Sequence, residues 1–123
     1  MDGQNTFERV LLLWQEADEE KRAIELEHLL SDDFVYVDAH LPETLNGREA
    51  FNDFLSLFRS RVENAIVESR VPLQRVKMHA RCGFRLIKDG NILGQGEYFL
   101  TFEGDRISRM CGFVDDRPAE QNS

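Results

Sequence analysis

The sequence has no excess of basic residues, no long apolar run and few cysteines. Its 123 residues include 15 Lys and Arg against 23 Asp and Glu, which gives a formal net charge of −8. So acidic a chain offers no basic surface to neutralise phosphates, which makes nucleic acids and anionic membranes poor candidate partners. The longest apolar run, residues 10–14, is too short for a membrane span or a signal peptide. We therefore expect a soluble, cytoplasmic protein.

Signals for bound metals and cofactors are missing as well. Cys82 and Cys111 lie far apart and lack the paired spacing of a zinc or redox motif, so we expect two reduced residues of the core or sheet. His28, His40 and His79 show no metal-ligand spacing with the carboxylates. There is also no glycine-rich phosphate loop and no nucleophile elbow. The sequence therefore predicts no metal, no nucleotide and no other cofactor.

What is present predicts helices in the first half of the chain. The chain is long enough for one hydrophobic core and too short for two comfortable domains. Apolar residues recur every three to four positions in three stretches, which are typical of helices packed by one face. Expected N-terminal caps of these helices are Asn5, Asp18 and Asn46.

Strands are predicted between and after these helices. The segment 34–38 alternates as a short strand with both faces covered. After Val62 the apolar period falls to two, and hairpin turns are expected at Asp89-Gly90 and Gly104-Asp105. The predicted strands of this antiparallel meander cover residues 65–71, 76–88, 91–103 and 106–115. Such an α+β chain packs its helices on one face of a curved sheet.

The two hairpins allow a prediction of the direction in which Glu97 points. With a two-residue loop in each hairpin, Glu97 pairs with Cys82 and Gly112 on the helix-facing side, where the glycine leaves room beside the carboxylate. A bulge at Gly94 or Gly96 would instead turn Glu97 to solvent. The first alternative places an acid in an apolar layer.

At this point the chain resembles the nuclear transport factor 2-like superfamily, which includes ketosteroid isomerases and the SnoaL-like polyketide cyclases. The resemblance covers nearly the whole chain. It rests on the order of elements, on SDDFVYVDAHLPETLNGREAFNDF and on FEGDRISRMCGFVD. It implies an α+β cone, in which three helices from the N-terminal half pack on the concave face of a curved antiparallel sheet around a deep apolar pocket. Residues 1–116 would form this single SnoaL-like domain and residues 117–123 a flexible tail.

The resemblance also implies roles for individual residues. Asp38 stands where the isomerases have their general base, and Glu97 where they keep a protonated Asp that donates to an oxyanion. The position of their oxyanion-binding Tyr is occupied by Val10 or a near neighbour. Two carboxyl groups in one apolar cavity do not easily both ionise, so Asp38 is expected as base and Glu97 as acid. The alternative for Asp38 is a loop-end residue that bonds the backbone.

Further residues are predicted to line the pocket. His40 could act at the rim, although a solvated loop histidine is the alternative, and Tyr36 could bond a ligand or only protein. The candidate ligand-binding residues are Trp14, Tyr36, His40, Phe54, Phe58, Phe84, Phe99, Met110 and Val114.

Two hypotheses for function follow. The first is a cofactor-independent enzyme of isomerase, dehydratase, cyclase or epoxide-hydrolase type that acts on a hydrophobic small molecule by carboxylate acid/base chemistry. The second is a non-catalytic dimeric ligand-binding or assembly module. In either case a homodimer is expected through the outer sheet face, which would carry Arg81, Tyr98, Arg109 and Phe113. A cavity of roughly 300 Å³ or more favours a ligand.

Overall fold

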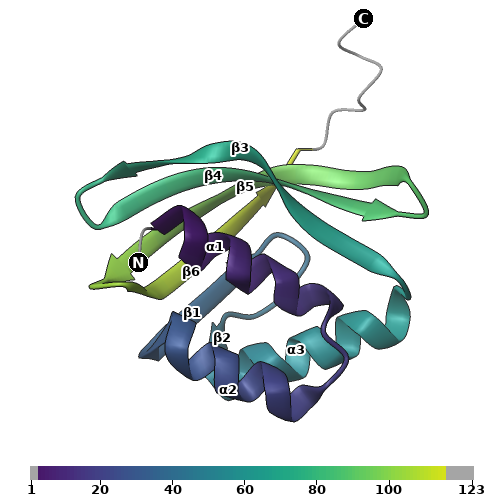
Figure 1. Cartoon of the computed structure of the whole chain (residues 1–123), viewed down its shortest axis with the longest axis horizontal. Coiled ribbons are helices and arrows are strands. Elements are labelled where there is room, and N and C mark those ends of the chain that lie inside the picture. The colour runs from purple at the N-terminus through teal and green to yellow at the C-terminus, as the bar shows by residue number, and fades with distance from the viewer. Residues whose placement is uncertain (1–2, 116–123) are drawn as a thin grey trace, which may run out of the picture.

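The computed structural model describes residues 3–115 and shows two layers, a curved sheet and three helices against one of its faces (Figure 1). The helices are α1 (Gly3–Leu12), α2 (Glu19–Leu29) and α3 (Arg48–Arg61), with a short 3-10 helix at Leu13–Gln15. The strands are β1 (Leu30–Asp38), β2 (Leu45–Asn46), β3 (Ala65–Val76), β4 (His79–Lys88), β5 (Asn91–Glu103) and β6 (Arg106–Val114). The predicted α+β class is confirmed, while the predicted tail, 117–123, lies outside the described residues.

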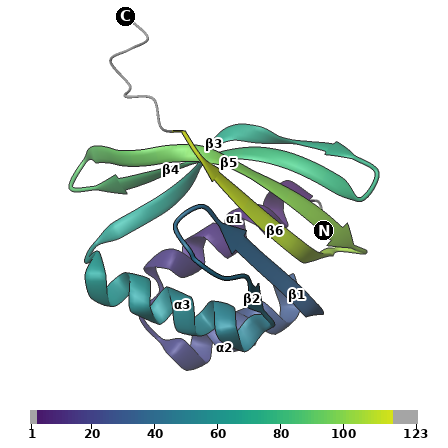
Figure 2. The ribbon, with the colours of Figure 1, turned by 180° about the vertical axis from the view of Figure 1, so that it is seen from behind.

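The sheet has six strands in the order β2-β1-β6-β5-β4-β3. Strands β3 to β6 form the predicted antiparallel meander. β1, however, pairs in parallel with β6, with Tyr36 opposite Met110 and Asp38 opposite Gly112. The two strands lie side by side in Figure 2. The sheet is therefore mixed rather than purely antiparallel, because β6, the last strand of the meander, lies beside β1, and the chain between them includes β2, α3 and the strands β3 to β5.

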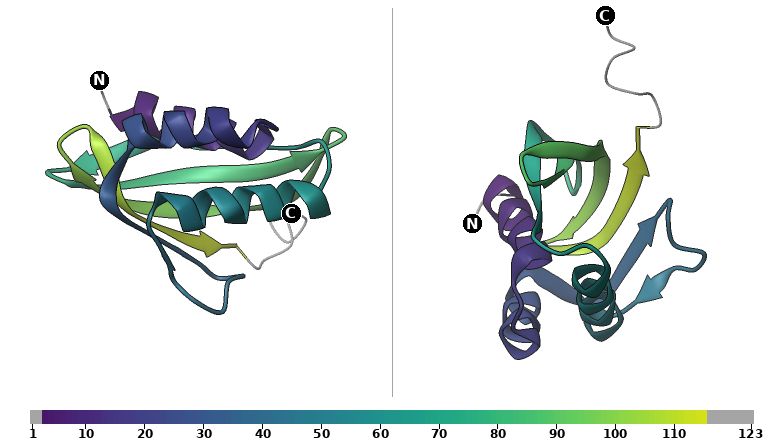
Figure 3. Two further views of the ribbon diagram at one scale, coloured as in Figure 1. Left: turned by 90° about the horizontal axis from the view of Figure 1, so that it is seen from below. Right: turned by 90° about the vertical axis from the view of Figure 1, so that its right-hand side faces the viewer.

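The helices cover the concave side of the sheet, where the core forms. In Figure 3 the strands curl around the side on which α1 and α3 lie. α1 buries Phe7, Val10 and Leu11, and α3 buries Phe51 and Leu55. These positions follow the three-to-four spacing read from the sequence, so the predicted apolar faces are the buried ones.

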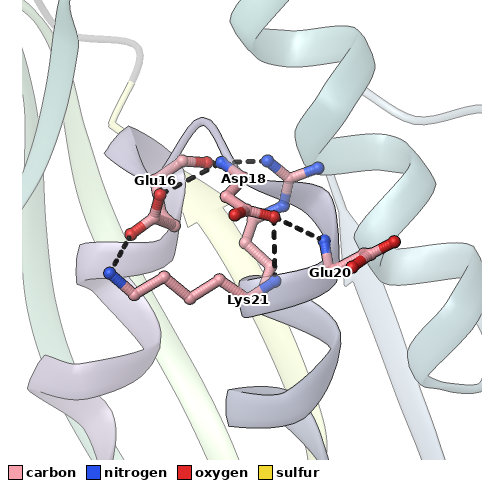
Figure 4. Close-up of polar contacts among 5 residues, drawn as sticks. Glu16, Asp18, Glu20 and Lys21 are labelled. Atoms are coloured by element: carbon pink, nitrogen blue, oxygen red, sulfur yellow. Dashed lines mark hydrogen bonds and ion pairs between the residues drawn. The ribbon is translucent and has the colours of Figure 1, made fainter.

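Only one of the three expected helix caps is present. Asp18 caps α2 by accepting the backbone N–H groups of Glu20 and Lys21, at 3.0 and 3.1 Å (Figure 4). Asn5 lies inside α1, which begins earlier, and Asn46 pairs with Val35 in β2. The residue that precedes α3 is Gly47, whose φ of 94° is a conformation that favours glycine.

The predicted register is wrong in the middle strand of the meander. Both hairpins begin as two-residue loops, but β5 has an extra residue at Leu93 and β6 has one at Ser108. Beyond each bulge, the side chains of the bulged strand lie on the opposite face of the sheet from the predicted one, until a second bulge reverses them again. Residues 94–102 of β5 are therefore reversed, so that Tyr98 points to the helices and Glu97 to the outer face. The second bulge restores the predicted face of β6 from Met110 onward.

Candidate functional site

A pocket of about 480 Å³ opens between the helices and the sheet. Its volume lies in the range of small-molecule sites. Its walls come from the 3-10 helix, from β1 and α3, and from the concave face of the meander. Aromatic rings dominate these walls, and they belong to Trp14, Tyr36, Phe54, Phe58, Phe84 and Tyr98.

Three polar side chains form a hydrogen-bond chain in this pocket. The Tyr36 hydroxyl donates to Oδ2 of Asp38 at 2.6 Å, and the hydroxyls of Tyr36 and Tyr98 are 3.1 Å apart. Oδ1 of Asp38 accepts the backbone N–H of His40 at 2.8 Å. The last bond is the loop-end role considered for Asp38, and Asp38 holds it while also lining the pocket.

The direction of the chain follows from the donor count of each group. An ionised Asp38 only accepts, so the single O–H of Tyr36 is used on the carboxylate. The bond between the tyrosines must then be donated by Tyr98. With Asp38 ionised, the chain runs from Tyr98 through Tyr36 to Asp38, and the oxygen of Tyr98 keeps a lone pair for a ligand.

Burial keeps both phenols protonated. Tyr36 is fully buried, and desolvation raises its pKa well above the ordinary value, with Tyr98 and Asp38 adding to the rise. Desolvation likewise raises the pKa of Tyr98, which is 3% exposed; its bond with Tyr36 opposes the rise in part. Neither phenol is therefore the group that gives up a proton at neutral pH.

The position of Tyr98 depends on a glycine opposite it in the sheet. Tyr98 pairs with Gly112, and a Cβ on that residue would lie 2.7 Å from the Tyr98 ring. The ring packs on Phe84, with centroids 4.6 Å apart, and edge-on to Phe7 at 6.1 Å. The space at Gly112 is thus filled by Tyr98 and not, as the sequence predicted, by the Glu97 carboxylate.

Most of the predicted site residues do line this pocket. They are Trp14, Tyr36, Asp38, His40, Phe54, Phe58, Phe84 and Val114. The exceptions are Glu97, Phe99 and Met110. Met110 is fully buried in the core, and Phe99 is 44% exposed on the outer face.

Glu97 is the main correction. Its side chain is 44% exposed and lies 3.6 Å from Nε of Arg81 in an ion pair. The hollow beside it, of about 190 Å³, is on the outer face and shares no residue with the pocket at Asp38. The expected pair of Asp38 and Glu97 in one cavity is therefore absent, because the Leu93 bulge turns Glu97 away, and the second carboxyl group in the wall of this pocket is that of Asp115.

Sequence reasoning missed several residues of the pocket. They are Val67, Leu86, Leu93, Gly94, Gln95, Tyr98 and Asp115. Tyr98 is the important one, since it completes the hydrogen-bond chain. The signal for it in the sequence is the pair of glycines at 94 and 96, which permits the bulge of the alternative register.

The two tyrosines make a sharp pH prediction, because the chain has no others. The unfolded chain releases both phenolic protons near pH 10, whereas the folded protein retains them. The folded state then binds more protons, so the free energy of unfolding must fall as pH rises above 10, by up to about 2.7 kcal/mol per pH unit. Urea unfolding at stepped pH, with phenolate absorbance recorded in parallel, checks this.

Two details sharpen the test. Burial raises the pKa of the Cys82 thiol to about 12, so Cys82 begins a similar fall in stability from about pH 9. Tyr98→Phe should halve the additional fall in the free energy of unfolding per pH unit that begins at pH 10. A phenolate signal that develops near pH 10 while the protein stays folded would contradict the buried chain.

Neither a metal site nor a membrane helix is found among the described residues. No three His, Cys, Asp or Glu side chains within residues 3–115 are grouped as metal ligands. No helix in that range is long and apolar enough to span a bilayer.

Comparison with known proteins finds relatives by structure alone. No family model and no curated protein matches the sequence. A suggested isomerase of the SnoaL-like family from Agrobacterium tumefaciens is 21% identical, with a TM-score of 0.83 over 94% of this chain and 99% of that one. A hypothetical protein with a ketosteroid isomerase-like fold from Catenulispora acidiphila, in complex with trimethylamine, is 18% identical, with a TM-score of 0.73 over 91% and 86%.

A third structure agrees with these two. A suggested SnoaL-like polyketide cyclase from Jannaschia sp. is 14% identical, with a TM-score of 0.66 over 89% of this chain and 85% of that one. The chain is thus an α+β cone with helices on the concave face of its sheet. This is the fold of the nuclear transport factor 2-like superfamily, as the sequence resemblance predicted.

Proposed function

We propose that this protein is a cofactor-independent enzyme that moves a proton on a hydrophobic small molecule, with Asp38 as general base. The observation that supports the proposal is the bond from Tyr36 to Asp38, whose carboxylate lines an aromatic pocket. A base needs access to substrate, and Asp38 lines the pocket. The suggested isomerase and cyclase with this fold support the reaction class by analogy only.

The hydrogen-bond chain couples the base to an oxygen-binding donor. When Asp38 takes a proton on Oδ2, it becomes a donor to Tyr36. The O–H of Tyr36 then turns to Tyr98, and the O–H of Tyr98 is released toward the pocket. A carbonyl substrate that loses a proton from the adjacent carbon gains negative charge on its oxygen, so the donor becomes available at the moment when that charge develops.

This mechanism replaces the acid predicted from the sequence. Tyr98 takes the role that had been given to Glu97, and its raised pKa keeps it a donor over the whole neutral range. Tyr98 thus supplies the phenol that the sequence lacks near Val10. We propose isomerisation or cyclisation through an enolate as the reactions that such a pair serves best.

A second candidate function is binding of a hydrophobic ammonium ion without catalysis. Aromatic faces attract ammonium cations, and Asp38 would supply the counter-charge. None of the described residues that line the pocket is Lys or Arg. The neighbour with bound trimethylamine gives this candidate its probe.

Deuterium exchange tests the first candidate without knowledge of the substrate. β-Tetralone, an apolar ketone with acidic C–H groups, is incubated with the protein in deuterium oxide and followed by proton NMR. We expect exchange beside the carbonyl to exceed the buffer rate. The fluorescence of Trp14, the one Trp of the chain and part of the pocket wall, reports binding in the same samples.

The outcomes separate the two candidates. Saturable quenching of Trp14 by β-tetralone without exchange would reject the enzyme and leave a binding module. Saturable quenching by trimethylamine hydrochloride, with neither binding nor exchange of the ketone, would favour the ammonium site.

The homodimer through the outer sheet face stays a prediction. Phe99 and Phe113 are 44% and 54% exposed there and pack edge to face at 5.3 Å. Exposed aromatic pairs are typical of interfaces. Tyr98, which was expected on that face, is not available to it. Light scattering, which measures the mass of the protein in solution, checks this prediction.

A further inference from the structure

A second cleft, of about 420 Å³, lies beside α3 and the turn that precedes α2. It shares no lining residue with the aromatic pocket. Its walls are polar and include two guanidinium groups. The lining residues are Ala17, Arg22, Ser56, Arg59, Ser60, Glu63 and Asn64.

Arg22 is a buried cation that forms no ion pair with a carboxylate among the described residues. Its side chain is 1% exposed. Nε donates to Oδ1 of Asn52 at 2.6 Å, Nη1 to the carbonyl of Glu16 at 2.7 Å, and Nη2 to Oγ of Ser56. All three acceptors are neutral. Buried arginines are normally paired with a carboxylate, because an unpaired buried charge is costly.

The surrounding acids do not supply that partner. Figure 4 shows Glu16, Asp18 and Lys21 engaged with one another at this turn: Glu16 accepts the N–H of Asp18 at 3.0 Å and pairs with Lys21 at 3.5 Å. Asp18 is used on the N-terminus of α2. Among residues 3–115, no carboxylate forms an ion pair with Arg22.

Arg59 brings a second positive charge to the same cleft. Its Nη1 donates to the carbonyl of Trp14 at 3.4 Å, and it too has no ion-pair partner within the described range. Desolvation lowers the pKa of Arg22, the nearby charge of Glu19 raises it, and the charge of Arg59 lowers it further. Two guanidinium groups thus line one cleft without an ion-pair partner among the described residues, and Glu63 is the one carboxylate in the described lining, in a chain with 23 acidic residues against 15 basic ones.

We propose that this cleft binds a small phosphate-bearing anion. A dianion neutralises both guanidiniums, whereas a carboxylate neutralises one, and guanidinium forks match phosphate oxygens. Ser56 adds a donor, since its oxygen accepts from Arg22 and its O–H remains to be donated. Ser60 adds none, because its hydroxyl donates to the carbonyl of Leu57 at 2.7 Å.

The negative charge of Glu63 repels an anion in this cleft, but the positive charges of Arg22 and Arg59 outweigh it. Glu63 is exposed, so water and salt screen its charge, whereas Arg22 is enclosed by protein and its charge is screened much less. Removal of the Glu63 charge should therefore tighten binding. This gives the proposal a variant expected to gain affinity.

The test measures thermal stability of the whole chain with inorganic phosphate, sulfate, acetate or chloride at matched ionic strength. We expect a saturable rise in melting temperature with millimolar phosphate, a smaller one with acetate and none with chloride. Sulfate separates general oxyanion binding from a preference for phosphate. Low concentrations keep the general stabilising effect of these salts small, and that effect does not saturate.

Three variants locate the site. Arg59→Gln should weaken phosphate binding at least tenfold, as expected for a lost charge-assisted hydrogen bond. Glu63→Gln should tighten it severalfold. Arg61→Gln, on the same helix and exposed but outside the cleft, is the matched control and should bind as the wild type does.

Three results would contradict phosphate binding in this cleft. The proposal is overturned if phosphate gives no saturable shift beyond that of chloride. Equal binding by the wild type and Arg59→Gln would also overturn it, as would an equal loss in Arg61→Gln. Arg22 is left unchanged, because its three bonds hold the helices together and its loss could unfold the protein.

Discussion

Replacement of Asp38 by asparagine is expected to lower the rate of deuterium exchange into β-tetralone about 10³-fold, within the range of a lost general base. Asparagine keeps one carbonyl oxygen, which can accept from Tyr36 and so preserve the hydrogen-bond chain, while its NH2 group replaces the oxygen that accepts the backbone N–H of His40. What is lost is the ability to take a proton. Proton NMR measures the rate, and Trp14 fluorescence shows that the ketone still binds.

Glu97→Gln is the control for this prediction, since it removes the other carboxylate that the sequence suggested. Glu97 lies on the outer face beside Arg81, so we expect its exchange rate to stay within about twofold of the wild-type rate, as for a group outside the reaction. A loss in Glu97→Gln as large as that in Asp38→Asn would reject the site. An undiminished rate in Asp38→Asn would reject the general base.

Most of the fold could be predicted from the sequence, because the patterns that indicate its helices, strands and turns are local. The change of apolar period after Val62, the turns at Asp89-Gly90 and Gly104-Asp105, and the three amphipathic helices each arise within a few residues. The parallel pairing of β1 with β6 brings Tyr36 beside Met110 from a distant part of the chain. No short-range pattern encodes that contact.

Only part of the candidate site could be predicted from the sequence, and the reason lies in strand β5. Both faces of β5 have apolar residues, with Leu93 and Phe99 on one side of the alternation and Leu100 and Phe102 on the other. The apolar pattern therefore does not determine which face of β5 points to the helices. The one-residue bulge at Leu93 determines it. Asp38 was expected from the family resemblance and Tyr36 from its place on the same face, and β1 has no bulge between the two.

Tyr98 shows how the corrected register and the chemistry depend on each other. Its hydroxyl reaches Tyr36 because Gly112 leaves space for its ring. Without the bulge, Glu97 would occupy that space, and the proposed donor would be a carboxyl group. In the proposed mechanism the bulge therefore selects a phenol, which burial keeps protonated at neutral pH.

The register itself is open to a direct test at Gly96. A Cβ at this position would lie 1.9 Å from the backbone oxygen of Phe113 in the neighbouring strand and 3.0 Å from the Phe84 ring. A backbone atom in a sheet cannot move aside without disturbing the pairing of β5 with β6. We expect Gly96→Ala to lower the free energy of unfolding by about 3 kcal/mol, at the upper end of overpacking costs.

Gly94→Ala is the matched control in the same strand. A Cβ there meets nothing within 4 Å, so the change should stay within about 0.5 kcal/mol of the wild type. Urea unfolding of the two variants measures the difference. Without the Leu93 bulge, Gly96 would face outward, where a methyl group is tolerated as easily as at Gly94. Equal stability of the two variants would therefore indicate the register without the bulge, in which Glu97 faces the pocket and Tyr98 does not.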